Sequence, residues 1–150
     1  MNRKKLSKNL SVGEVIRGSG FNEWDEVPEE IQDAITQTAE ELFQPIREAI
    51  GKPVFVLSGG AIRSKEMNER VRGAKRSQHL LGTALDCRCT DPGDTVALYD
   101  LVVQMQSDGR LPHGGAALYL TKSGRPRFVH IDRRGRKARW NTGARTKADW

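Results

Sequence analysis

Asp86 lies in the middle of an apolar, alternating segment at residues 83–89, and this placement constrains the fold more than any other feature. The alternation predicts a β-strand with Leu85 and Cys87 on the opposite face from Asp86. A carboxylate inside such a strand is costly to bury unless a cation accompanies it. The fold must therefore bring either a metal ion or a nearby arginine to Asp86.

His79 precedes Asp86 by seven residues and falls in an expected loop before Gly82. A glycine at position 82 lets the backbone turn sharply, so that the loop can fold back onto the strand. Ala84 is small and shares the strand face of Asp86, which leaves room above that face. We therefore expect the side chains of His79 and Asp86 to meet at one point.

A second strand pattern at residues 128–132 carries another histidine. Its alternation puts Phe128, His130 and Asp132 on one face, opposite two apolar residues that should meet the core. Two imidazole nitrogens and one carboxylate oxygen suit Zn²⁺ and leave a fourth position for water. Hydrolysis by such water needs a base, and Asp132 is the first candidate because it lies two residues beyond His130 on the same face.

The remaining patterns predict a single α+β domain over residues 1–150, with a small, largely antiparallel sheet, flanking helices and the zinc site on the sheet face. A helix should begin at Pro28, kink or split at Pro45 and end at Gly51. The other expected elements are a strand at 53–57, a helix at 64–71, a strand at 83–89, a helix from 90 or 91 to about 107, and strands at 116–120 and 127–132. Residues 1–27 should be irregular apart from a short amphipathic stretch near 12–16, and residues 1–10 and 141–150 should be loose.

Several segments together resemble the zinc D-alanyl-D-alanine carboxypeptidases and their hedgehog-like murein peptidase relatives, in the phage-endolysin-like branch. Residues 77–86 are similar to the family signature S-x-H-x-x-G-x-A-x-D, and residues 128–132 are similar to the later signature that supplies the third ligand. Residues 57–68 resemble the family's S-G-Y-R-S-x-x-x-N segment, and residues 43–53 resemble its helix and strand entry. The likeness extends over roughly residues 10–140.

The resemblance implies one Zn²⁺ per chain, with His79, Asp86 and His130 as its ligands. It also implies hydrolysis of bacterial peptidoglycan peptides at a bond involving a D-amino acid, by a carboxypeptidase or an endopeptidase. Arg63 matches the arginine that steadies the scissile carbonyl or a substrate carboxylate, a role that suits its permanent charge and forked donors. The alternative for Arg63 is a surface arginine in a turn.

Ser77 and Gln78 directly precede His79, the first ligand. They are either residues that contact the ligands or the substrate, or loop residues without a role. The chain departs from the family pattern at three places. Residues 60–62 replace a single tyrosine, and Arg127 stands where many relatives have a catalytic acid. Phe128 stands where some relatives have a histidine, and His113 is either its replacement or an exposed turn histidine.

The formal charge of +6 is unevenly distributed, because residues 22–41 hold eight acids and no base, whereas residues 121–150 hold ten Lys or Arg and two Asp. This basic region is a candidate for binding anionic cell-wall polymers or nucleic acid, or is simply a solvated face. Trp140 and Trp150 are the only aromatic residues that follow Phe128 there, and no standard nucleic-acid motif occurs, which disfavours nucleic acid.

No apolar run reaches the roughly 20 residues needed to cross a bilayer, so no membrane insertion is expected. The basic N-terminus is not followed by an apolar stretch, which predicts synthesis in the cytoplasm without a signal peptide. Action on the cell wall would then require a phage-type release.

Cys87 and Cys89 are expected to be buried small hydrophobes rather than a disulfide or a zinc site. A non-catalytic zinc-binding virion or envelope module of the same fold is the alternative to a peptidase.

Overall fold

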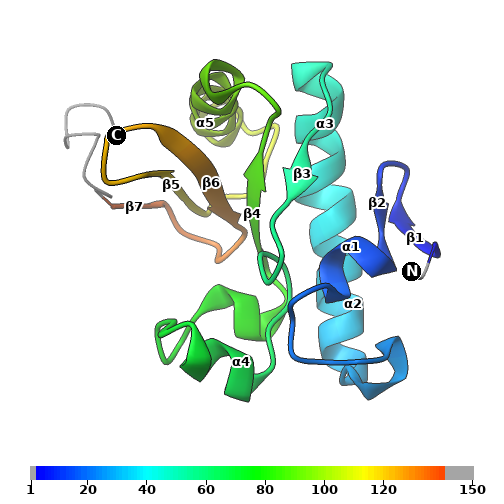
Figure 1. Cartoon of the computed structure of the whole chain (residues 1–150). Coiled ribbons are helices and arrows are strands. Elements are labelled where there is room, and N and C mark those ends of the chain that lie inside the picture. The colour runs from blue at the N-terminus through cyan, green and yellow to red at the C-terminus, as the bar shows by residue number, and fades with distance from the viewer. Residues whose placement is uncertain (1–2, 141–150) are drawn as a thin grey trace.

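The computed structural model describes residues 3–140 and shows an α+β fold built on a five-stranded sheet of order β3-β4-β6-β5-β7 (Figure 1). All neighbouring strands are antiparallel except β5 and β7, which are parallel. The strands are β3 Phe55–Val56, β4 Ala84–Arg88, β5 Gly115–Leu120, β6 Pro126–Asp132 and β7 Ala138–Arg139. The predicted fold class and the largely antiparallel sheet are therefore confirmed.

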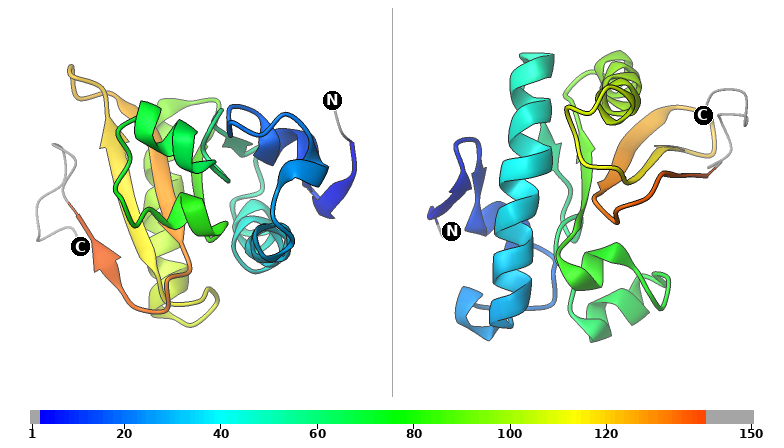
Figure 2. Two further views of the ribbon diagram at one scale, coloured as in Figure 1. Left: turned by 90° about the horizontal axis from the view of Figure 1, so that it is seen from below. Right: turned by 180° about the vertical axis from the view of Figure 1, so that it is seen from behind.

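The helices cover both sides of this sheet. They are α1 Val12–Ile16, α2 Glu29–Thr38, α3 Gln44–Ile50, α4 Lys65–Arg70 and α5 Pro92–Ser107, with short helical turns at Trp24–Glu26, Ala39–Phe43 and Gln78–Leu81. Helix α5 lies against one face of the sheet, and α4 lies on the other side (Figure 2). None of the described helices is long and apolar enough to span a membrane.

The first long helix begins after Pro28 and ends at Gly51 as predicted, but in place of the expected kink or split at Pro45 it widens just before that residue. Pro28 precedes α2, and Gly51 ends α3 in the left-handed conformation with φ of 66°. Between them the chain forms a π-helical turn at Ala39–Phe43. Pro45 lacks a backbone N–H and its ring crowds the carbonyl of residue 41, so a wider turn at this point relieves the clash.

Strand β4 is buried on both faces, and its register with β6 decides which side chains meet. Leu85 lies opposite Ile131 and Cys87 lies opposite Val129, and all four side chains enter the apolar core. Both cysteines are free and buried, as the sequence predicts. On the other face Asp86 lies directly opposite His130, which brings the two predicted ligands together.

The N-terminal segment is more ordered than predicted. Lys5–Ser7 (β1) and Leu10–Ser11 (β2) form a small antiparallel hairpin, so the expectation of a loose segment over residues 1–10 is wrong for these residues. Leu6 and Leu10 are buried in the core, which anchors the hairpin. Ser11 and Glu14 then cap α1 reciprocally, at the predicted amphipathic stretch. Residues 141–150, also expected to be loose, lie outside the described residues.

Candidate metal centre

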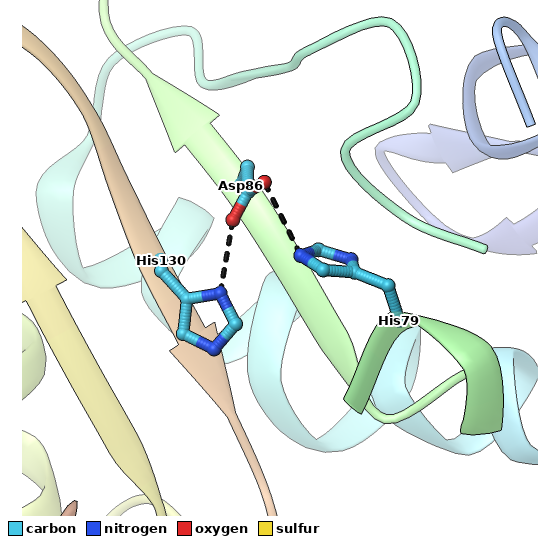
Figure 3. Close-up of side chains that lie close together, drawn as sticks. All are labelled: His79, Asp86 and His130. Carbon is cyan, nitrogen blue, oxygen red and sulfur yellow. Dashed lines mark hydrogen bonds and ion pairs between the residues drawn. The ribbon is translucent and has the colours of Figure 1, made fainter. Parts of the chain in front are cut away.

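Three secondary-structure elements bring His79, Asp86 and His130 to one point (Figure 3). His79 lies in the turn Gln78–Leu81, Asp86 in β4 and His130 in β6. Gly82 ends the turn with φ of 74°, a conformation that few residues other than glycine adopt, and redirects the chain into β4. The predicted folding of this loop onto its own strand therefore occurs.

The polar atoms of the three side chains converge within a small volume. His79 Nε2 lies 3.2 Å from Asp86 Oδ2, and His130 Nδ1 lies 3.0 Å from Asp86 Oδ1. One nitrogen or oxygen atom from each residue lies within 4.8 Å of the other two. All three residues are buried, with exposed fractions of 3%, 6% and 7% for His79, Asp86 and His130.

The outer nitrogen of each imidazole is held by a neighbour that only accepts hydrogen bonds. His79 Nδ1 donates to the carbonyl oxygen of Ala61 at 2.7 Å, and His130 Nε2 donates to Asp132 Oδ2 at 2.8 Å. A neutral imidazole carries one N–H, so the nitrogens that face Asp86 present lone pairs. Two lone pairs and a carboxylate therefore meet in a buried space, and they require a cation between them. Two nitrogens and one oxygen fit Zn²⁺ with an open fourth position.

The charge state of the cluster agrees with this arrangement. Burial opposes ionisation of Asp86, but when the facing nitrogens of His130 and His79 carry a proton in place of a metal ion, their hydrogen bonds outweigh burial and hold the pKa of the carboxyl well below its ordinary value. Burial also lowers the pKa of His130, whereas its contacts with Asp132 and Asp86 raise it above the ordinary value. The site therefore favours an ionised carboxylate that attracts a proton or a metal cation.

Asp132 lies behind His130 and is fully buried. Its Oδ1 accepts from the backbone N–H groups of Gly115 at 2.8 Å and Arg134 at 3.1 Å, and its Oδ2 is shared by His130 and the Arg134 guanidinium. Burial would raise the pKa of Asp132, but these donors hold it well below the ordinary value. The structure thus places Asp132 against the outer side of a ligand, and not in the hollow beside the cluster.

Arg63 touches the cluster from the opposite side. Its guanidinium donates to the Gly59 carbonyl at 2.8 Å, to Asn68 Oδ1 at 3.2 Å and to Asp86 Oδ2 at 3.4 Å. Burial lowers its pKa, and the charge of Asp86 acts in the opposite direction. Of the two partners that the sequence left open for Asp86, the arginine is therefore present as Arg63, and the two histidines complete a group that could hold the metal ion.

A hollow of about 560 Å³ opens above the cluster and has an aromatic wall. Tyr119 and Phe128 are partners across β5 and β6 and stack with ring centroids 4.5 Å apart. Trp140 donates from Nε1 to the Tyr119 hydroxyl at 3.0 Å, and its ring centroid lies 5.1 Å from that of His130. Tyr119 is a residue of the site that the sequence did not single out, although its position opposite Phe128 follows from the predicted hairpin.

Other predicted residues divide between this hollow and the rest of the surface. Ser77 and Gln78 line it, and Ser77 Oγ accepts a hydrogen bond from the backbone N–H of His79. Gln78 Oε1 accepts from the Thr83 hydroxyl at 2.7 Å. His113 is exposed and lines a separate hollow of about 190 Å³, so the structure does not bring it to the cluster.

The fold and the buried His–Asp–His cluster together define a small α+β domain with a candidate site for one metal ion. A family model described as Peptidase M15 matches residues 19–132. The chain therefore belongs to the Peptidase M15 family, whose members are zinc-dependent peptidases, and the predicted resemblance is confirmed. A search of the curated proteins found no match.

Proposed function

We propose that the protein is a zinc-dependent peptidase that hydrolyses peptide bonds in bacterial peptidoglycan, with His79, Asp86 and His130 holding one Zn²⁺. The observation that carries the proposal is the convergence of two lone pairs and a carboxylate in a buried site at the base of an open hollow. Family membership supports the same reaction class. When bound, zinc polarises a carbonyl and lowers the pKa of water to roughly 7.

Asp132 serves this site as a positioning residue. Asp132 accepts a hydrogen bond from the N–H at His130 Nε2, so that Nδ1 is the nitrogen turned toward Asp86. Carboxylates that orient a ligand histidine in this way raise its basicity and tighten metal binding. Because both oxygens of Asp132 are occupied by donors, it is poorly placed to take a proton from water in the hollow.

Arg63 and Tyr119 supply hydrogen-bond donors to the hollow. Arg63 lines the hollow at the side of Asp86, where its charge can stabilise an oxygen that becomes negative during hydrolysis. Tyr119 accepts a hydrogen bond from Trp140, which leaves its own O–H available to donate. These groups bind and orient the peptide carbonyl, while the aromatic wall excludes water from one side.

One observation favours the alternative, a non-catalytic zinc-binding module. Among residues 3–140, Asp86 is the only carboxylate that lines the hollow, and it is already assigned to the metal. Arg127, at the family's usual acid position, is exposed and lines a neighbouring hollow. If the protein is a peptidase, the proton of the attacking water must therefore be removed without a second carboxylate from the described part of the chain.

The deciding experiment treats purified sacculi with the zinc-loaded protein and identifies released muropeptides by mass spectrometry. The peptidase proposal expects new peptide termini that are absent with the His79→Ala variant. Metal content is measured on the same samples. Zinc bound by the normal chain without any cut bond would overturn the peptidase proposal in favour of the non-catalytic module.

We also propose that the basic segment after β6 holds the protein near anionic wall polymers, following a phage-type release from the cytoplasm. Four cationic residues at 133–137 support this proposal. Retention on purified walls should fall with added salt and in an Arg136→Gln, Lys137→Gln variant. Retention that is indifferent to both changes would refute it.

A further inference from the structure

A second hollow adjoins the first at the metal cluster. It has a volume of about 500 Å³, similar to the 560 Å³ of the first, and both lie within the range of about 300–1,000 Å³ that ligand sites occupy. The two hollows share four lining residues: Arg63, Val71, Asp86 and Phe128. The two hollows therefore meet at these side chains, and together they are called the groove.

The strand order places the two arms of this groove on opposite sides of the cluster. The second hollow is lined by Leu57, Ser58 and Gly59, which follow β3 at one edge of the sheet. The first is lined by Tyr119 on β5 and by Trp140 just after β7, at the other edge. Strands β4 and β6 lie between these edges (Figure 1). Asp86 is in β4 and His130 is in β6. The groove thus runs across the sheet from β3 to β7, past the cluster.

Within residues 3–140, the junction of the two arms contains one cation, Arg63, which the proposed function assigns to the scissile carbonyl. A carboxypeptidase must hold a terminal carboxylate close to the scissile bond, and a positive side chain at a closed end is the usual means. The charge of Arg63 is balanced by Asp86, and three of its N–H donors are bonded to Gly59, Asn68 and Asp86. The remaining donors serve the scissile carbonyl, which leaves no second cation at the described junction for a terminal carboxylate. Val71, an exposed apolar residue, lies at the same junction.

Both arms carry cationic side chains farther from the cluster. Arg72 and Arg76 are exposed on the first arm, and Arg127 is exposed on the second. None of these three forms an ion pair with another residue of the described chain. Within residues 3–140, Asp86 is again the only acid in the lining of either arm. The groove is therefore positive on both sides of the cluster.

We propose that this protein is an endopeptidase, whose substrate peptide extends along both arms and carries free carboxylates on both sides of the bond that is cut. This inference rests on the proposed peptidase function and specifies its substrate. Arg127 recognises acidic groups on one side of the bond, and Arg72 and Arg76 recognise them on the other. These arginines are specificity-determining residues.

The test uses the bond that muropeptide analysis identifies. Synthetic peptides containing that bond are prepared with one residue or with three residues beyond it, each with a free or an amidated C-terminus. If the protein is an endopeptidase, it should cut the longer peptide at the same internal bond. The values of kcat/KM for the peptides with free and amidated C-termini should then agree within about threefold. Release of the terminal residue alone, with a loss of tenfold or more on amidation, would overturn the proposal. If no peptide and no sacculus is cut although zinc is bound, the peptidase function fails instead.

Variants of each arm test the recognition of acidic groups. Arg127→Gln and Arg76→Gln should each raise KM about two- to fivefold for peptides acidic on one side, which is the size expected of an exposed ion pair. The two variants should respond to acidic groups on opposite sides of the bond. Each effect should vanish when that carboxylate is amidated. Lys122→Gln, an exposed change in the β5–β6 turn outside both hollows, should leave KM unchanged. Equal effects on acidic and neutral peptides would contradict the proposed roles.

Discussion

His130 and Asp132 stand two residues apart on β6, and the imidazole Nε2 of His130 donates a hydrogen bond to Asp132 Oδ2 at 2.8 Å. This contact determines that Nδ1, and not Nε2, is directed at Asp86. Asp132 is in turn held by Arg134 and by the backbone N–H of Gly115. The ligand geometry thus depends on a buried carboxylate that lies outside the hollow.

Asp132→Asn should weaken zinc binding by about 10- to 100-fold, the range seen when partners of ligand histidines are removed. The asparagine amide would place an NH2 group beside the Arg134 and His130 donors, which need an acceptor. It would therefore weaken the hydrogen bond from His130 Nε2 that orients the imidazole. Competition with a chelator measures the affinity, and circular dichroism checks the fold. If the variant binds zinc normally yet loses hydrolysis, Asp132 acts as a base and the positioning role is wrong.

Removal of zinc should lower the melting temperature, because a buried carboxylate and two imidazole lone pairs then lack their shared cation. A ligand at 100 times its Kd stabilises a fold by about 2.7 kcal/mol. Thermal unfolding with zinc and with excess chelator measures the difference. His79→Ala should abolish most of the shift, and a shift of unchanged size in that variant would exclude His79 as a ligand.

Trp140→Phe should destabilise the fold by about 0.5–1.5 kcal/mol, the usual net contribution of one hydrogen bond. Phenylalanine keeps an aromatic ring near His130 but cannot donate to the Tyr119 hydroxyl. Tyr119→Phe removes the same bond from the other side. Urea unfolding of both single variants and the double variant should therefore give non-additive losses. Strictly additive losses would show that the two side chains are not coupled.

Gly115→Ala should destabilise the protein by about 1–3 kcal/mol and weaken zinc binding. A Cβ atom at this position would lie 2.4 Å from Asp132 Oδ2, so Asp132 or β5 must shift. Gly124→Ala is the comparison, since its Cβ meets nothing within 4 Å and only the backbone, with φ of 85°, is strained. Its zinc affinity should remain normal. Equal zinc affinity in both variants would show that Asp132 tolerates displacement.

Elements that are set by local sequence patterns could be predicted, whereas contacts between residues distant in the chain could not. The long helix, β4 and the β5–β6 hairpin are governed by local periodicity, prolines and glycines, so their positions were predictable. Strands β2 and β7 have two residues each, too few to show an alternation, whereas the equally short β3 was predicted from the apolar run at 53–57. Trp140 was therefore missed as a site residue, because it reaches His130 only through the pairing of β7 with β5.

The sequence by itself determined the three residues of the candidate metal-binding set. Asp86 and His130 alternate with apolar residues on two strands, and His79 precedes a glycine turn into the first of them. The tertiary structure alone decided which nitrogen of His130 faces Asp86, which groups hold Asp132 and where the hollows lie. These features depend on side-chain hydrogen bonds and on the order of strands in the sheet, which join residues distant in the chain.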